Sequence, residues 1–342
     1  MTGKGFKSTI YKLPIRTTLM ISFVLQVVIA VGLIWLITYR SGQKAVKDVA
    51  LQLRAELTNR IMDKLDAYTD IPLHVNRMNA NALAQNALEV SPPQGEFQFW
   101  QQMQSYPTLS YIYCGDEQGG FMGVGRLSQE DRSQLGLFFS NAATNFIRQD
   151  FGLDERGNRT VQTGTLEKHY DPRGRPWYKA AKASQEAVWS DIYLSFSTQL
   201  PTLTASVPVY SPSDGSLLGV CGTDFFLSEE MSHFLQNLEI GKTGTAFIME
   251  RSGTLVATSS QEPMLEGSGE NLERLVATAS DDVDIQETTQ YLKSQFSDLD
   301  GIQAVQKLDF TLDGERQYLQ VVPFQKQNLD WLVVLVIPES DF

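Results

Sequence analysis

The chain has 342 residues, which is enough for two ordinary domains. Hydrophobic residues make up 42% of the chain and charged residues 20%, which is the composition of a folded protein. Its net charge is -12. This acidity argues against a nucleic-acid partner, because affinity for a phosphate backbone depends on lysine and arginine. The two cysteines and three histidines form neither a zinc-ligand spacing nor a disulfide framework.

Residues 1–17 form a short basic head that contains no acid, and residues 18–39 form an uncharged apolar run. A helix of that length spans the roughly 30 Å hydrocarbon core of a bilayer. A buried core helix would rarely stay apolar on every face, and a signal peptide would be shorter and end in small residues. We therefore expect an uncleaved transmembrane helix. The basic residues of the head are Lys4, Lys7, Lys12 and Arg16.

The orientation of this helix follows from the lengths of its flanks, since four basic residues precede it and four follow it closely. The short head should stay in the cytoplasm, whereas a long downstream domain translocates largely regardless of charge. We place the chain in an inner membrane, with everything from about residue 40 on the periplasmic side. The downstream basic residues are Arg40, Lys44, Lys47 and Arg54.

Residues 40–95 are predicted to form stalk helices. Apolar side chains recur there every three or four residues, which is typical of one helix face. This stripe either pairs with a second copy, giving a homodimer, or packs on its own domain. Pro72 is expected to kink the helix, and a second helix is expected over 73–89. The stripe comprises Val46, Ala50, Leu53, Leu57, Ile61, Leu65 and Tyr68.

Short strands and turns follow after Pro107 and predict a module with an antiparallel sheet over residues 96–238. A smaller version of the same plan fills residues 239–342. The fold class is therefore α+β, a long N-terminal helix followed by two tandem modules, and any output domain is expected beyond the chain. Strands are predicted at 109–114, 121–125, 203–210, 217–226, 245–250, 254–258, 317–324 and 331–337, and helices at 228–237, 270–279 and 284–296.

Cys114 and Cys221 lie in apolar, strand-like runs. We interpret them as two buried thiols that act as small hydrophobic residues. A disulfide is the alternative, if the two strands are neighbours in an oxidising compartment. His74, His169 and His233 are too far apart to suggest a metal site. No metal or cofactor is expected.

No motif in the chain supports catalysis. A Gly-x-Ser-x-Gly elbow, a His-Glu-x-x-His pair and a P-loop are all absent from the sequence. The glycine-rich residues 119–125 lie in a predicted hairpin and lack the dinucleotide-binding spacing. We therefore expect a protein that is not an enzyme.

Residues 170–178 read YDPRGRPWY and hold two arginines, a tryptophan and two tyrosines. Arg175 precedes a proline, which keeps it extended rather than helical. An extended arginine beside aromatic rings is suited to bidentate binding of a carboxylate, and Trp177 can add an indole donor. The alternative is that this run starts a helix and packs the core.

The anchor, the long helix, the run at 170–178 and the smaller second module together resemble the double Cache sensor domains of bacterial transmembrane receptors, over about residues 40–342. The resemblance implies two PAS-like modules. The membrane-distal one, 96–238, would hold a small-molecule pocket, and 239–342 would be membrane-proximal. Six residues match the pattern of the amino-acid-binding subgroup, which implies that they bind the ligand. They are Tyr170, Arg175, Trp177, Tyr178, Tyr193 and Asp224.

This chemistry suits an amino acid, whose carboxylate fits Arg175 and Trp177 and whose ammonium fits Asp224 with tyrosine hydroxyls. An exposed carboxylate at a strand end is the alternative for Asp224. For the whole chain, the alternatives are a sensor of an organic acid, a purine or another small ligand in the same fold, and a structural dimeric stalk with a vestigial pocket. The residues do not identify the side chain of the ligand, nor whether the output is chemotaxis, a histidine kinase or a cyclase.

Overall fold

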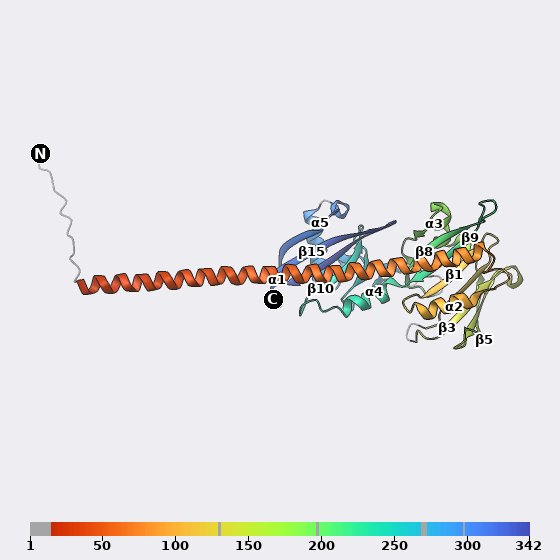
Figure 1. The fold of residues 1–342 in the computed structure, drawn as a ribbon, viewed down its shortest axis with the longest axis horizontal. Coiled ribbons are helices and arrows are strands. Elements are labelled where there is room, and N and C mark those ends of the chain that lie inside the picture. Colours follow the sequence, from red (N-terminus) through yellow and green to blue (C-terminus); the bar gives the residue numbers. More distant parts are fainter. Residues whose placement is uncertain (1–14, 129–130, 196–197, 268–271, 297) are drawn as a thin grey trace, which may run out of the picture. The chain divides into compact units, whose positions relative to one another are not determined.

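A computed structural model of the chain describes residues 15–128, 131–195, 198–267, 272–296 and 298–342. Helix α1 (Ile15–Ala84) precedes helix α2 (Glu96–Ser105) and two main antiparallel sheets (Figure 1). The chain divides into two compact units, one comprising Met1–Leu53 with Phe342 and the other Arg54–Asp341. The predicted α+β class with two antiparallel sheets is confirmed. Lys4, Lys7 and Lys12 of the basic head lie outside the described residues.

The first part of α1 is apolar on all sides. Within the described residues, one helix is long and apolar enough to cross a membrane, and the qualifying stretch begins at Leu19. None of its most apolar 18-residue window is buried within the structure. The rings of Trp35 and Tyr39 stack near the end of the apolar run, with centroids 5.6 Å apart. Length and composition thus agree with the predicted membrane span.

From Arg54 onward, α1 packs against both sheets. The Arg54 guanidinium donates to the carbonyl of Leu319 over 2.9 Å. Further along, the Asn76 amide donates to the carbonyl of Ala205 over 2.7 Å and accepts from the Thr223 hydroxyl over 2.6 Å. These bonds are buried, so they fix the rotation of the helix on the sheets.

The apolar stripe of α1 packs on its own domain over the part that lies in this unit. Leu57, Ile61, Leu65 and Tyr68 are at most 7% exposed. Tyr68 also contacts the ring of Phe225, with centroids 4.9 Å apart. Of the two expected uses of the stripe, packing on the chain's own sheets therefore applies to these four residues.

α1 continues through Pro72 to Ala84, so the helix predicted after Pro72 is confirmed over residues 73–84, but it is part of α1 and not a second helix. Proline removes one backbone donor and crowds the preceding turn. Here its neighbours are held by tertiary contacts, since Leu73 and Val75 are buried and Asn76 bonds to the sheet. Packing thus overrides the local preference of the sequence.

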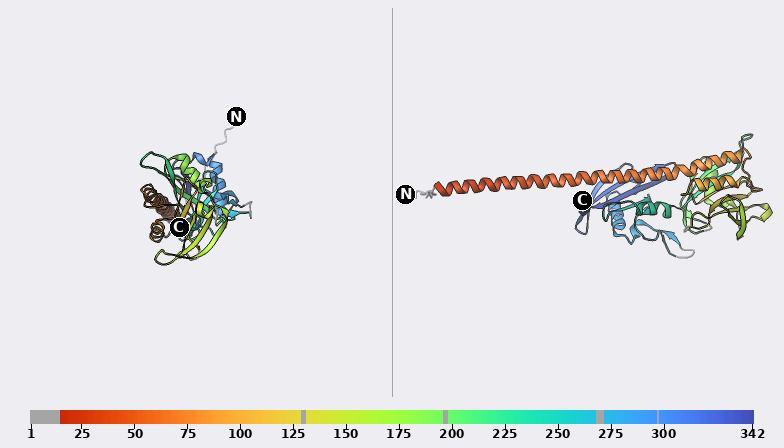
Figure 2. Two further views of the ribbon diagram at one scale, coloured as in Figure 1. Left: turned by 90° about the vertical axis from the view of Figure 1, so that its right-hand side faces the viewer. Right: turned by 60° about the horizontal axis from the view of Figure 1, so that its bottom comes forward.

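In the described residues, the larger sheet has nine strands in the order β5-β4-β3-β2-β1-β9-β8-β6, with β7 paired to β8. Helix α3 (Pro176–Ser184) precedes β6, and α4 (Leu227–Gln236) follows β9. Figure 2 shows α2 beside the end of α1, where Asn79 bonds to Gln102. The strands are β1 Tyr111–Asp116, β2 Phe121–Arg126, β3 Leu135–Ser140, β4 Ile147–Leu153, β5 Arg159–His169, β6 Val188–Trp189, β7 Tyr193–Leu194, β8 Pro201–Tyr210 and β9 Leu217–Phe225.

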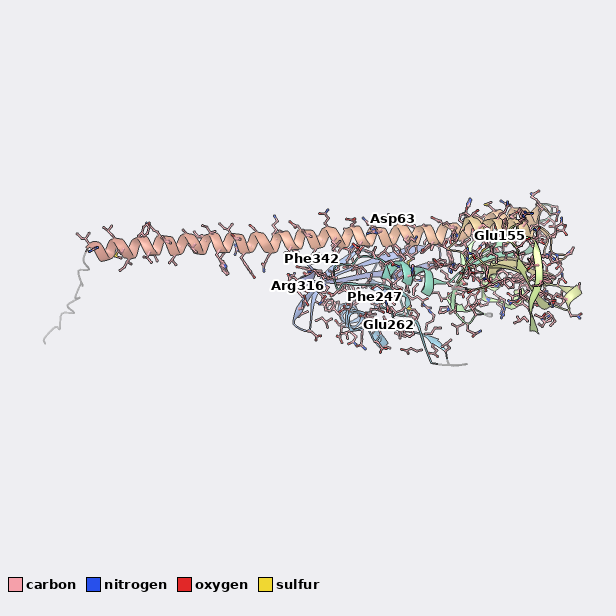
Figure 3. The ribbon with its side chains drawn as sticks, turned by 90° about the horizontal axis from the view of Figure 1, so that it is seen from below. Asp63, Glu155, Phe247, Glu262, Arg316 and Phe342 are labelled. Carbon is pink, nitrogen blue, oxygen red and sulfur yellow. A yellow bond between two sulfur atoms is a disulfide. The ribbon has the colours of Figure 1, made fainter. Side chains whose placement is uncertain are left out.

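The smaller sheet has five strands in the described residues, in the order β11-β10-β16-β15-β14, and helix α5 (Val283–Gln295) packs on it. Figure 3 labels Phe247, fully buried in its core, and Arg316, exposed on the same module. The strands are β10 Thr245–Glu250, β11 Leu255–Thr258, β14 Gln306–Leu312, β15 Glu315–Lys326 and β16 Leu329–Pro338, with a separate pair β12 Leu265–Glu266 and β13 Glu273–Arg274.

The helix predicted over 270–279 is wrong where the structure describes it. The short strand β13 and a 3-10 turn at Ala277–Ala279 take its place, and residues 270–271 lie outside the described residues. The carbonyl of Leu275 accepts from the Leu255 amide over 2.9 Å, and the Leu275 amide donates to the carbonyl of Met264 over 3.0 Å. This backbone pairing keeps the segment extended.

Cys114 and Cys221 form a disulfide, so the interpretation as two free thiols is wrong and the alternative holds. They are cross-strand partners on β1 and β9, with Cα atoms 4.0 Å apart, and both are fully buried. The two residues are separated by 107 positions, so their contact depends on sheet order and not on local pattern. Such a bond persists in oxidising compartments.

Candidate ligand-binding site

A cavity of about 260 Å³ opens in the module of the larger sheet. Its lining combines aromatic rings with three charged side chains, those of Arg148, Arg175 and Asp224. β1, β4, β7, β9 and the start of α3 all contribute to this lining. The structure therefore brings five of the six predicted site residues to one cavity. They are Tyr170, Arg175, Trp177, Tyr193 and Asp224.

Asp224 lies near the end of β9 and is only 8% exposed, which excludes the alternative of a solvent-exposed strand-end carboxylate. The hydroxyl of Thr204 donates to its Oδ1 over 2.7 Å, and the hydroxyl of Tyr113 donates to the same oxygen. Oδ2 has no hydrogen-bond partner among the residues that the structure describes. One oxygen is thus held by the protein and the other is available to a ligand donor.

Burial raises the pKa of Asp224 to about 6, against the lowering effect of the hydrogen bonds from Tyr113 and Thr204. Burial also raises the pKa of Tyr113 and of Tyr193 well above the usual value, and the Asp224 charge adds to both shifts. At neutral pH the carboxyl is therefore ionised while both phenols keep their protons. The site presents an anion surrounded by neutral hydroxyl donors.

The raised pKa predicts that ionised Asp224 destabilises the ligand-free fold. A folded-state pKa above the unfolded value gives stability that is present below pH about 4 and is lost as pH rises through about 6. The side-chain amide of the Asp224→Asn variant carries no charge at any pH and still accepts from both hydroxyls. We expect Asp224→Asn to raise the free energy of unfolding at pH 7.5 by up to about 3 kcal/mol.

Urea unfolding of wild type and Asp224→Asn at pH 7.5 and pH 4.5 measures this effect. The difference between the two proteins should shrink at the lower pH, where Asp224 is protonated. Asp284→Asn is the positive control, since burial also raises the pKa of Asp284 in the other module, and its difference from wild type should likewise shrink at the lower pH. A pH-independent difference at position 224 would contradict the assignment.

Arg175 is extended, as predicted from the proline that follows it, with φ -82° and ψ 149°. It precedes α3, whose first residue is Pro176, a favoured position for proline. The Arg175 guanidinium carbon lies 5.1 Å from the centroid of the Tyr170 ring, within range of a cation–π contact. Arg175 thus lines the cavity from an extended backbone position immediately before α3.

Trp177 and Tyr178 occupy the first turn of α3 but face different surroundings. Trp177 lines the cavity and contacts Tyr113, with ring centroids 4.8 Å apart. Its indole N–H makes no hydrogen bond among the described residues. Tyr178 is fully buried, lies outside the cavity lining and donates to the Glu117 carboxylate over 2.8 Å. The run 170–178 therefore both lines the cavity and packs the core, and Tyr178 belongs to the packing.

Tyr193 lies on the short strand β7, and its hydroxyl is 2.8 Å from that of Thr204. Because Thr204 donates its own proton to Asp224, it accepts from Tyr193 at this contact. The hydroxyls of Tyr193 and Thr204 therefore form a short relay that ends on the carboxylate. The predicted site included Tyr193, at one end of this relay, but not Thr204, at its middle.

Tyr113 and Thr204 are site residues that the sequence reasoning missed, and a signal existed for Tyr113. Gly123 and Gly222 are its cross-strand partners on either side. A Cβ atom at Gly222 would lie 2.5 Å from Cε2 of the Tyr113 ring, and one at Gly123 would lie 2.5 Å from the Tyr113 Cβ. Gly222 therefore makes room for the ring, and Gly123 makes room for the base of the side chain. Within the glycine-rich stretch 119–125, it is Gly123 that packs against Tyr113. No sequence pattern marked Thr204 as a site residue.

Arg148 was also missed, although it adds a second cation to the cavity lining. Its Nε and Nη2 bond to the two carboxylate oxygens of Asp150 over 2.8 and 2.9 Å. Its guanidinium carbon also lies 5.0 Å from the centroid of the Phe138 ring. Because Asp150 neutralises it, Arg148 adds polarity more than net charge to this wall.

The profile of a family described as Cache domain, of the dCache type, matches residues 43–342. The chain belongs to the Cache domain family. Among solved structures, the ligand-binding domain of the Campylobacter jejuni chemoreceptor Tlp3, in complex with 4-methylisoleucine, aligns with a TM-score of 0.54 at 12% identity. The alignment covers 86% of this chain and 92% of that domain, which shows a shared fold.

Two curated relatives of this Cache domain chain are methyl-accepting chemotaxis proteins. PscA of Pseudomonas syringae pv. tomato is 24% identical over 197 residues, which cover 56% of this chain and 30% of that protein. McpA of Pseudomonas putida is 25% identical over 173 residues, covering 49% of this chain and 26% of that protein. The chain thus matches less than a third of the length of either relative.

Proposed function

We propose that this Cache domain binds an amino acid in the cavity of the larger-sheet module and is the sensing part of a transmembrane receptor. The observation that carries the proposal is the pair of opposite charges on one cavity, Arg175 and Asp224. The ligand carboxylate would bind Arg175 with help from the Trp177 indole. Its ammonium would donate to Asp224 Oδ2 and to neighbouring tyrosine oxygens.

Charge balance supports a zwitterion over a simple ion. A cavity with one cation and one anion can desolvate a zwitterion without leaving a net buried charge, whereas a simple ion would leave one protein charge unpaired. Arg148 does not disturb this balance, because Asp150 pairs with it. Similarity to Tlp3 adds only a fold-level analogy.

An organic acid is the second candidate ligand. Arg148 and Arg175 both line the cavity, so a ligand with carboxylates alone could bind Arg175 and could also bind Arg148 by displacing Asp150. It would have to leave Asp224 protonated or paired with something else. The pKa of about 6 makes protonation of Asp224 accessible under mildly acidic conditions.

A thermal-shift screen of the purified chain tests the proposal, with the twenty amino acids in one arm and simple organic acids and purines in the other. A large increase in the unfolding midpoint with an amino acid is the expected result, since a ligand that binds only the folded state stabilises it. A shift with organic acids or purines alone would select another ligand class. No shift with any class would favour a structural stalk.

We further propose that the Cache domain lies on the periplasmic side of the inner membrane, anchored by the apolar part of α1. The apolar helix, the Cys114–Cys221 disulfide and the chemoreceptor relatives support this placement. We expect such a sensor to control a chemotaxis output domain, since the two named relatives are methyl-accepting chemotaxis proteins.

A homodimer remains part of the proposal, through the part of the stripe that precedes Arg54. We expect single cysteines at Val46 and Leu53 to crosslink between copies in native membranes, because apolar helix faces pair in water, and a cysteine at the fully buried Ala50 to crosslink less. A cysteine at Lys47, off the stripe, is the matched control. Equal crosslinking at all four positions, or none at any, would argue against a helical seam.

A further inference from the structure

The acid of the cavity is hydrogen-bonded to a residue that also holds the neighbouring segment. The side chain of Thr204 donates to Asp224 over 2.7 Å and accepts from Tyr193. The backbone of Thr204 bonds to Ser190 twice. Its carbonyl accepts from the Ser190 amide over 2.9 Å, and its amide donates to the Ser190 hydroxyl over 3.1 Å. A shift of Thr204 would therefore strain both of its hydrogen bonds to Ser190.

Trp189, the residue before Ser190, is hydrogen-bonded to the smaller-sheet module. Asn328 lies in the turn between β15 and β16 of the smaller sheet. Its Oδ1 accepts from the Trp189 amide over 3.0 Å, and its Nδ2 donates to the Trp189 carbonyl over 2.7 Å. One side-chain amide thus satisfies both backbone groups of a residue 139 positions away.

This pair of hydrogen bonds requires a side-chain amide at position 328, because one group must accept from the Trp189 amide while its neighbour donates to the Trp189 carbonyl. Trp189 is 1% exposed, so the contact lies in a shielded environment where hydrogen bonds are stronger. The indole N–H of Trp189 is buried and has no acceptor among the described residues. A buried donor without a partner is costly, so the two backbone hydrogen bonds from Asn328 help to hold Trp189 in this position.

We propose that Asn328 is a positioning residue for the ligand site, and that the path Asp224–Thr204–Ser190–Trp189–Asn328 couples occupation of the cavity to the smaller-sheet module. The ligand-coupling part rests on the proposed function. Binding of an ammonium to Asp224 changes the charge that Thr204 faces. Coupling free energies are reciprocal, so a change at Asn328 must also be felt at the cavity.

Hydrogen exchange measured by mass spectrometry on the ligand-free 342-residue chain tests the path. Thr204→Val removes the hydroxyl that joins Asp224 and Tyr193 and leaves Asn328 in place. We expect it to speed exchange of the amides at 326–331 by about threefold or more. Thr204→Ser keeps the hydroxyl and should behave as wild type. Asn328→Ala should in turn speed exchange over 190–195, beyond the residue that it contacts.

Asn158→Ala is the matched control, because Asn158 is a turn asparagine whose side chain bonds to Asp154 within its own turn. It should change exchange at neither segment. Unchanged exchange at 326–331 in Thr204→Val, in a protein that unfolds at the wild-type midpoint, would overturn the path. If Thr204→Val does not fold, the effect of Asn328→Ala on 190–195 decides the question.

Calorimetry with the amino acid found by screening tests whether the path is coupled to ligand binding. Asn328→Ala is expected to weaken its binding by about tenfold although it touches no ligand atom. Equal affinity in wild type and Asn328→Ala would overturn the coupling while the proposed function stands. If wild type binds no amino acid, the proposed function fails, and the exchange measurements still decide whether the path links the two modules.

Discussion

Asp224→Asn is expected to weaken amino-acid binding by at least about two powers of ten. A hydrogen bond to a charged group contributes about 1.5–3 kcal/mol, and loss of the anion also leaves the ligand ammonium buried without a counter-charge. At about 1.4 kcal/mol for each tenfold change, these two effects together exceed a hundredfold. The variant keeps the acceptor for Tyr113 and Thr204, so the cavity wall should stay in place.

Calorimetry at pH 7.5 measures this loss, and Asp284→Asn in the smaller-sheet module is its control. The same substitution that removes affinity is expected to stabilise the ligand-free fold, because burial of the ionised carboxyl is unfavourable. Wild-type affinity in Asp224→Asn would show that the ammonium does not bind there. The ligand class would then shift toward a plain carboxylate.

Arg175→Gln is expected to produce a loss of similar size, at least about a hundredfold, through the other end of the ligand. Glutamine can donate a hydrogen bond but supplies no charge and no two-pronged geometry for a carboxylate. With Asp224 intact, a bound amino acid would bring a buried carboxylate without a cation. Titration of the variant with the same amino acid gives the affinity ratio.

Arg173→Gln is the matched control for Arg175→Gln. Arg173 lies two positions earlier, is paired with Asp171 and lies outside the cavity lining. It should bind as wild type does. If Arg173→Gln and Arg175→Gln weaken binding equally, the effect belongs to the packing of the turn before α3 and not to a carboxylate contact.

The elements that the sequence predicted well are those with a local signal. The apolar run of α1, the strand pairs on either side of short turns and the extended Arg175 before a proline all depend on neighbours in sequence. Features decided by distant contacts were missed. Pro72 stays helical because α1 is anchored to the sheets, and residues 273–275 are extended because they pair with other backbone segments.

The candidate site divides in the same way. Five residues of the predicted pattern line the cavity, but Tyr178 turns to Glu117 because adjacent residues in the first turn of a helix point in different directions. Tyr113 enters the site through sheet order, since β1 pairs with both β2 and β9. The disulfide between Cys114 and Cys221 depends on that same pairing.

We propose that one cavity recognises both charged ends of an amino acid. Calorimetry of the purified chain at pH 7.5 tests it directly, with the best amino acid from the screen, the amine that lacks its carboxylate and the acid that lacks its ammonium. We expect measurable binding of the amino acid and affinities at least about a hundredfold lower for both analogues. Binding of the acid analogue as tight as that of the amino acid would contradict it.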